Sequence, residues 1–155
     1  MRKDLMPRIL IDADACPVKD ETYKVAARHA VPVVVVSNSP IRVPQTALIT
    51  RKVVSDAFDA ADDWIVENTD AATVVITADI LLADRCLKLG ASVVAPNGKP
   101  FTSASIGSAI ATRAIMADLR AGGDIVGGPA PFSKQDRSRF LSALDEVLVK
   151  RARGA

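Results

Sequence analysis

The chain has 155 residues, 49% of them hydrophobic and 25% charged, which is enough apolar sequence for one sizeable core and argues against disorder. Residues 1–7 carry charges but no apolar stretch of a secretory signal, and the longest apolar run, residues 30–36, is too short to span a bilayer. The two cysteines, Cys16 and Cys86, do not suggest a disulfide framework. We therefore expect one domain over residues 1–155, in a cytoplasmic protein of bacterial type that does not enter a membrane.

The formal net charge of +2 hides an asymmetry along the chain. Residues 1–84 hold 9 Lys or Arg and 13 Asp or Glu, for a net −4, whereas residues 85–155 hold 11 and 5, for a net +6. An acidic part with a metal site beside a basic part would suit a polyanion such as RNA or another single-stranded nucleic acid. A basic part that is merely solvated gives the same counts, so both interpretations stay open.

Strands and helices are predicted to alternate over the first two thirds of the chain. Runs of Val, Ile and Leu predict strands, and apolar residues at helical spacing predict helices. In chain order we expect strand 8–12, helix 17–29, strands 32–36 and 47–54, helix 57–68, strand 73–77, helix 80–89 and strand 92–94. This alternation predicts an α/β fold of three layers, in which a mostly parallel sheet is flanked by helices on both faces.

The C-terminal part, about residues 102–151, is predicted to be helical. One helix runs to about residue 121, a Gly- and Pro-rich connection covers 122–131, and Ser133 with Asp136 three residues later resembles a capping box that opens the last helix. That helix carries an apolar stripe, formed by Phe140, Leu141, Leu144, Val147 and Leu148. The stripe fits either a homodimer interface or packing onto the chain's own sheet.

Aspartates follow two of the predicted strands. Asp12 and Asp14 come at and just after the end of the first strand, and Asp79 comes two residues after the strand 73–77. Open α/β sheets bind ligands in the crevice beyond the carboxyl ends of their strands. We therefore expect these carboxylates to meet at one water-accessible edge of the sheet.

The predicted helix 57–68 supplies further carboxylates. At about 100° per residue, Asp62 falls at the edge of the apolar stripe that Ile65 marks, Asp59 lies beside it, and Asp63 points toward solvent. Asp62 is thus the carboxylate in this helix that we expect to be held against the sheet.

Clustered carboxylates predict a site for a hard divalent cation. Two unit charges at 4 Å repel by about 4 kcal/mol at an effective dielectric of 20, so a cluster needs protons, basic side chains or a cation to offset the repulsion. Oxygen ligands in an open site favour Mg²⁺ or Mn²⁺, which can activate water for phosphodiester hydrolysis. We assign Asp12, Asp14, Asp62 and Asp79 as candidate catalytic residues, and Asp12, Asp59, Asp62 and Asp79 as candidate metal ligands.

Each carboxylate also has a simpler explanation. Asp79 could be only the N-cap of the next helix, and Asp62 could belong to a solvated helix face. Two other functions remain open: aspartyl phosphoryl transfer, with Asp12 as nucleophile and Asp14 as acid or base, and a non-catalytic module that binds nucleic acid or protein. The absence of a well-placed Lys after Asp79 argues against phosphoryl transfer.

Several polar and basic residues could contact a substrate near this edge. Ser37 and Asn38 follow the second strand, Lys19 and Arg42 flank the same loops, and Arg113 lies on the long helix after residue 102. Each of them is a candidate phosphate contact, although a turn accounts for the first two and a solvated charge for the others.

Five segments resemble the bacterial YaiI/YqxD family, which has no established activity. They are DADACPVK (12–19), SN (37–38), FDAADDWI (58–65), TADI (77–80) and GGPAPFSKQDRSRF (127–140). The resemblance runs in order from residue 9 to residue 148, with Ala57 in place of the family's usual Gly and Leu81 in place of a frequent Pro.

By fold, that family is grouped with PIN-like domains, α/β nucleases that bind Mg²⁺ or Mn²⁺. The resemblance therefore implies a nuclease-type hydrolase in which Asp12, Asp62 (or Asp59) and the segment Thr77-Ala78-Asp79 supply the acidic positions. Asp84 would be the fourth acid. Fold alone does not fix activity.

Overall fold

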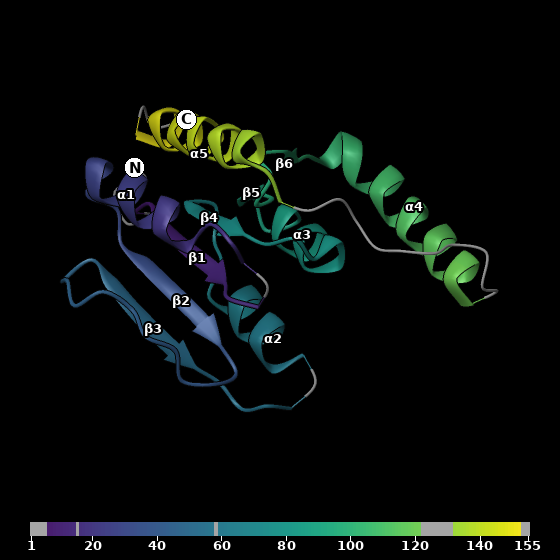
Figure 1. Ribbon diagram of the computed structural model, residues 1–155, viewed down its shortest axis with the longest axis horizontal. Helices are drawn as coiled ribbons and strands as arrows, with labels where there is room; N and C mark the ends of the chain where they lie inside the picture. Colours follow the sequence, from purple (N-terminus) through teal and green to yellow (C-terminus); the bar gives the residue numbers. More distant parts are fainter. Residues whose placement is uncertain (1–5, 15, 58, 122–131, 153–155) are drawn as a thin grey trace.

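A six-stranded sheet forms the middle layer of the protein. The computed structural model describes residues 6–14, 16–57, 59–121 and 132–152. The strands are β1 (Arg8–Asp12), β2 (Val33–Ser37), β3 (Ile49–Val53), β4 (Thr73–Ile76), β5 (Ser92–Val94) and β6 (Pro100–Phe101). Their order across the sheet is β3-β2-β1-β4-β5-β6, and all neighbours are parallel except β5 and β6 (Figure 1).

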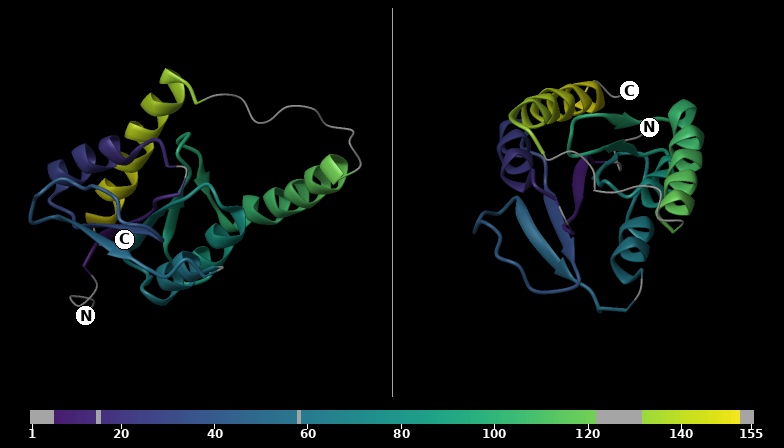
Figure 2. Two further views of the ribbon diagram at one scale, coloured as in Figure 1. Left: turned by 60° about the horizontal axis from the view of Figure 1, so that its bottom comes forward. Right: turned by 45° about the vertical axis from the view of Figure 1, so that its right-hand side comes forward.

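Helices cover both faces of this sheet, as Figures 1 and 2 show. Helices α1 (Lys19–His29) and α5 (Lys134–Ala152) pack side by side over one face, and α2 (Ala60–Glu67) and α3 (Ile80–Leu87) lie over the other. Helix α4 (Ser103–Ala121) packs on α3 and extends outward from the body of the protein. The predicted three-layer α/β fold is confirmed.

Two apolar cores, one on each side of the sheet, hold the layers together. Alternate residues of β1 serve the two cores, since Ile9 and Ile11 face α1 and α5, whereas Leu10 faces α2 and α3. This two-sided burial explains why the strands are continuous aliphatic runs rather than alternating patterns. Asp12 lies two residues after Leu10 in β1. Side chains two residues apart in a strand point to the same face of the sheet, so the Asp12 carboxylate lies on the α2 side.

The strand order reverses between β1 and β4. The chain moves outward from β1 through β2 to β3, then returns to the other side of β1 with β4 and β5. In open α/β sheets such a reversal leaves a crevice beyond the carboxyl ends of the two strands. Asp12 ends β1 and Thr77 follows β4, so both lie at this point.

Helix α5 packs onto its own sheet. Phe140, Leu144 and Leu148 are buried in the core that contains α1. The predicted capping box is confirmed, because the Ser133 amide donates to Asp136 Oδ2 at 3.0 Å and the Asp136 amide donates to Ser133 Oγ at 3.1 Å. Packing onto the sheet therefore explains the apolar stripe, and the possible homodimer stays a prediction.

The predicted boundaries needed some corrections. Strand β6 was missed, because two residues beginning with a proline carry no pattern. Helix α2 begins at Ala60 rather than at residue 57, since Asp59 just before it adopts a left-handed backbone with φ 65. Helix α1 begins at Lys19 rather than at residue 17, after a turn at Pro17 and Val18.

Parts of the predictions concern residues that the structure does not describe. The connection predicted at 122–131, Phe58 of the segment FDAADDWI and Ala15 of the segment DADACPVK lie outside the described residues. Among the helices that the structure does describe, none combines the length and the apolar character that a bilayer crossing requires.

Candidate functional site

Asp12 is held in place by the strand beside it. The register pairs Ile11 of β1 with Ile76 of β4, so the next residues, Asp12 and Thr77, are neighbours. The hydroxyl of Thr77, which is only 2% exposed, donates to Asp12 Oδ2 at 2.8 Å and accepts a hydrogen bond from the Asp79 amide at 2.9 Å. Thr77 thus links the end of β1 to the beginning of α3.

Asp79 is the N-cap of α3. Its Oδ1 accepts hydrogen bonds from the amides of Leu81 at 2.9 Å and Leu82 at 3.2 Å. The capping interpretation of Asp79 is therefore confirmed. Capping does not remove its charge from the site, since the charge of Asp79 raises the pKa of both Asp12 and Asp62.

Asp62 comes from the first turn of α2. Ile65, one turn later, is fully buried against the sheet, so Asp62 is half-buried while Asp63 points outward and pairs with Arg85 of α3 at 3.1 Å. The helical spacing predicted this difference between Asp62 and Asp63.

The pKa of Asp62 is raised from 3.8 to about 6. Burial is the largest cause, followed by the charges of Asp79, Asp12 and Asp59, while Arg85 acts in the opposite direction. A carboxyl with this pKa exchanges its proton close to neutral pH, which is the range where general acids and bases work best.

Asp12 experiences the same crowding. Burial raises the pKa of its carboxyl above 3.8, and the charges of Asp14 and Asp79 add to that effect. Hydrogen bonds from the Thr77 hydroxyl and the Asp14 amide favour the ionised form and partly compensate. Acids from three separate segments, β1, α2 and the start of α3, therefore share one electrostatic environment.

Asp14 and Asp59 lie at the margin of this group. Both are exposed. Each contributes through its charge, Asp14 to Asp12 and Asp59 to Asp62.

The carboxylates have the right chemistry to bind a metal ion, but their arrangement in the structure does not form a metal site. Crowded carboxylates with raised pKa values suit a hard divalent cation. Within the described residues, however, no three His, Cys, Asp or Glu side chains are arranged so that they could hold a metal ion as they stand. The ligand set Asp12, Asp59, Asp62 and Asp79 therefore stays a prediction.

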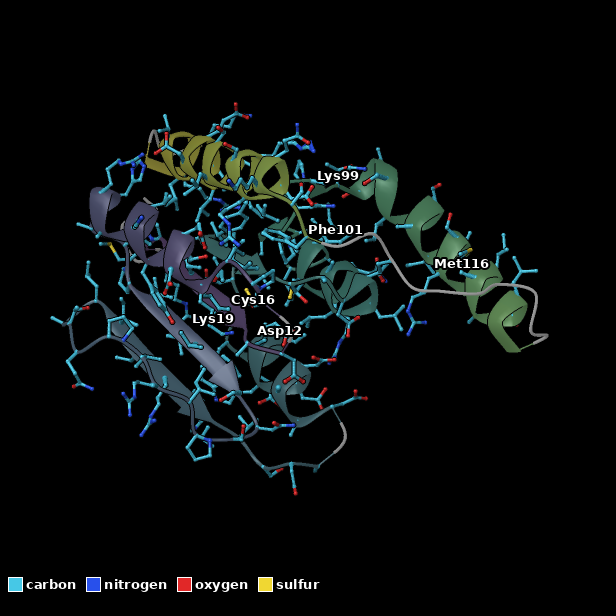
Figure 3. The ribbon with its side chains drawn as sticks, in the orientation of Figure 1. Asp12, Cys16, Lys19, Lys99, Phe101 and Met116 are labelled. Atoms are coloured by element: carbon cyan, nitrogen blue, oxygen red, sulfur yellow. The ribbon has the colours of Figure 1, made fainter. Side chains whose placement is uncertain are left out.

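The structure does not bring the predicted substrate contacts to the carboxylates. The ammonium of Lys19 donates to the Cys16 carbonyl at 3.1 Å, beside Asp12 at the junction of β1 and α1 (Figure 3). The hydroxyl of Ser37 donates to the Ser39 carbonyl at 2.5 Å, which supports the turn interpretation. The three remaining candidates, all exposed, are Asn38, Arg42 and Arg113. Among the described residues, no ion pair or hydrogen bond joins any of these five to the carboxylates.

Cys16 is a packed residue. It is 8% exposed, and burial raises the pKa of its thiol above the ordinary value. Both effects oppose thiolate formation, so Cys16 forms part of the wall behind Asp12.

A family model described as "Uncharacterized BCR, YaiI/YqxD family" matches residues 10–150. The chain belongs to the YaiI/YqxD family. It is 71% identical over 149 residues to a "UPF0178 protein" of Sphingopyxis alaskensis, covering 96% of this chain and 97% of that relative.

Two other relatives carry the same name, "UPF0178 protein". One, from Rhodopseudomonas palustris strain TIE-1, is 57% identical over 150 residues, with 97% of this chain and 95% of the relative covered. The other, from Azorhizobium caulinodans, is 58% identical over 142 residues, with 92% and 89% covered. No solved structure matches the chain. These comparisons establish the YaiI/YqxD family and leave the PIN-like grouping untested.

Sequence reasoning missed one residue of the site. Arg85 pairs with Asp63 and lowers the pKa of Asp62. It is one of several basic residues on helices, and only the packing of α3 beside α2 distinguishes it.

Proposed function

We propose that this YaiI/YqxD protein is a PIN-like, divalent-cation-dependent phosphodiesterase that acts on RNA or another single-stranded nucleic acid. Its acidic centre consists of Asp12, Asp62 and Asp79. The observation that carries the proposal is the raised pKa of Asp62, about 6, because two of its causes are the charges of Asp79 and Asp12. Three chain segments thus bring their carboxylates within electrostatic range at the β1–β4 switch point.

The donor set fits Mg²⁺ or Mn²⁺ by its chemistry. Asp12 and Asp62 would hold the ion, and Asp79 would join them, since both hydrogen bonds of its cap use Oδ1. A bound divalent ion supplies positive charge and a more acidic water.

The residues of the chain have distinct roles in this proposal. Thr77 keeps the Asp12 carboxylate at the end of β1 by its 2.8 Å hydrogen bond. Asp62 takes up or releases a proton near neutral pH while no ion is bound, and would be an ionised ligand once the ion is held. Lys19, beside Asp12, would meet the phosphates of an incoming strand, and Arg42 stays a predicted phosphate contact.

Cleavage assays with isosteric variants test the proposal. Metal-stripped protein is incubated with mixed RNA and single-stranded DNA, with and without Mn²⁺ or Mg²⁺, and is compared with Asp12→Asn, Asp62→Asn and Asp79→Asn. Asn also caps helices well, so Asp79→Asn removes the charge and keeps the cap. Asp63→Asn is the matched control, because Asp63 is the exposed neighbour of Asp62.

We expect metal-dependent cleavage that falls at least about a hundredfold in each of the three variants and little in the control. Calorimetric titration with Mn²⁺ provides a readout independent of activity. Absence of cleavage over the whole substrate panel, together with salt-sensitive binding, would favour the non-catalytic binding module. A covalent phosphate on Asp12 would favour aspartyl phosphoryl transfer instead.

A further inference from the structure

A cavity lies at the opposite edge of the sheet from the carboxylates. It has a volume of about 690 Å³. Pro7 lies just before β1, Ala72 just before β4 and Ser92 at the start of β5, so the cavity opens at the amino ends of the parallel strands. Phe101 of β6 also lines it and is well separated from Asp12 in Figure 3.

The wall of this cavity is largely apolar and made of small residues. Leu87, Val93, Phe101 and Val147 supply apolar side chains, and alanines and a glycine leave the space between them open. Pockets for small organic ligands typically have about 300–1,000 Å³ and a similar apolar lining with a few fixed polar groups. The volume and the lining therefore suit a small molecule with an apolar body.

Among the residues that the structure describes, the charged groups of the lining are positive. Lys150 and Arg151, at the end of α5, line the cavity, and no described Asp or Glu belongs to its lining. Two acids act on these cations. The Asp70 carboxylate accepts hydrogen bonds from the Ala72 amide and the Thr73 hydroxyl, and its charge also acts on Arg151. Glu146 pairs with the Lys150 ammonium at 3.8 Å, but both side chains are largely exposed, so this pair is weak.

Arg151 is the fixed cation of the cavity. Its Nε and Nη2 donate to Ser92 Oγ at 3.2 and 2.6 Å, and Nη2 also donates to the Gly90 carbonyl at 3.3 Å. These bonds fix the plane of the guanidinium, and no carboxylate within the described part of the chain forms an ion pair with it. A guanidinium oriented in this way, with Nη1 outside these three bonds, is preorganised to receive an anion.

We propose that this cavity, named here the β5–α5 pocket, binds a small organic anion: an apolar or aromatic body that ends in a carboxylate or a phosphate monoester. The anionic group pairs with Arg151 and Lys150, and the body occupies the apolar wall that Val93 and Phe101 form. The pocket is not lined by Asp12, Asp62 or Asp79, so anion binding there does not depend on the proposed phosphodiesterase activity.

The probes for a test are 2-naphthoate and 2-naphthyl phosphate, with 2-naphthalenemethanol as the neutral analogue and inorganic phosphate as the anion without a body. Binding to the full chain is measured in EDTA by isothermal titration, and amide NMR shifts locate it. We expect at least one naphthyl anion to bind with a Kd below about 1 mM, to shift the amides of Gly90 and Ser92, and to bind at least tenfold more tightly than the neutral analogue. The two anions identify which headgroup the pocket prefers.

Charge variants decide whether the cations are responsible. Lys150→Glu should weaken anion binding about tenfold and Arg151→Gln at least as much, whereas Lys24→Glu, an exposed lysine of α1, and Asp12→Asn should leave it unchanged. Because Arg151 also ties α5 to β5, Lys150→Glu is the decisive variant if Arg151→Gln does not fold. Three results would overturn the proposal: no binding to the folded protein, equal binding of the neutral analogue, or full affinity in Lys150→Glu.

Discussion

Replacing Asp62 by Asn should stabilise the protein at neutral pH. Asp62 has a pKa of about 6 in the folded protein, against an ordinary value of 3.8, so the folded state binds its proton more tightly than the unfolded chain does. The contribution of Asp62 to the free energy of unfolding is therefore largest below about pH 3.8, and it is lost as the pH rises through about 6. Asn removes the charge that causes this loss.

The size of the effect follows from the same pKa. A rise from 3.8 to about 6 corresponds to about 3 kcal/mol at 1.36 kcal/mol per pH unit. Asp62 is only half-buried, so water screens part of this energy, and we expect a gain of about 1–2 kcal/mol for Asp62→Asn at pH 7.5. At pH 4 the wild-type carboxyl is protonated in the folded state, and the two proteins should be about equally stable.

Urea unfolding in EDTA at pH 4 and pH 7.5 measures the difference. Asp63→Asn provides the control, since that side chain is exposed and its loss should change the free energy of unfolding by less than about 0.5 kcal/mol at either pH. The reasoning is refuted if Asp62→Asn is no more stable than wild type at pH 7.5, or if its gain is the same at pH 4. Either result would mean that burial and the neighbouring charges do not raise the pKa of Asp62 in solution.

Other substitutions test the packing around the site. Thr77→Val removes the buried donor to Asp12, and the free energy of unfolding in urea should fall by about 1–3 kcal/mol. An unchanged free energy of unfolding would mean that this hydrogen bond does not stabilise the fold. Gly98→Ala should lower the free energy of unfolding by at least about 2 kcal/mol, because φ is +89 and a Cβ would lie 2.5 Å from a backbone carbon of Arg139. Gly107→Ala is the contrasting variant: a Cβ there meets nothing within 4 Å, so the free energy of unfolding should rise by up to about 1 kcal/mol. Leu144→Ala should lose about 2–5 kcal/mol in the same assay, since this side chain is fully buried between α5 and the sheet, and a loss below 1 kcal/mol would contradict that packing.

The carboxylate positions that follow strands were predictable from the sequence. Aliphatic runs identified β1 and β4, and the parallel arrangement of such runs implied that the residues after them meet. Helical spacing then distinguished half-buried Asp62 from exposed Asp63. These inferences succeeded because each needed only local periodicity and one topological rule.

Other features depend on packing that no local pattern records. Strand β6 exists because Phe101 pairs with Val93 across the sheet edge, and the pair of Arg85 with Asp63 exists because α2 and α3 lie side by side. The role of Asp79 was ambiguous for a different reason. An Asp after a strand is both a good N-cap and a good site residue, and here it is the cap of α3 while its charge acts on Asp12 and Asp62.

The helix termini alone do not explain how the carboxylate cluster is tolerated. Asp62 and Asp79 lie at the N-termini of α2 and α3, where a helix dipole stabilises an anion by about 0.3–1 kcal/mol. Each of Asp12, Asp62 and Asp79 still feels the charge of another, as the raised pKa values of Asp12 and Asp62 show, so the two helix ends do not cancel the repulsion. Arg85 offsets part of the remainder, and below pH 6 a proton on Asp62 offsets more. Above that pH the proposed divalent cation would offset the rest, so Mn²⁺ should raise the thermal unfolding temperature of the wild type at pH 7.5 more than at pH 5, and should have little effect on Asp62→Asn at either pH. An equal Mn²⁺ response at both pH values would show that the ion binds elsewhere on the protein.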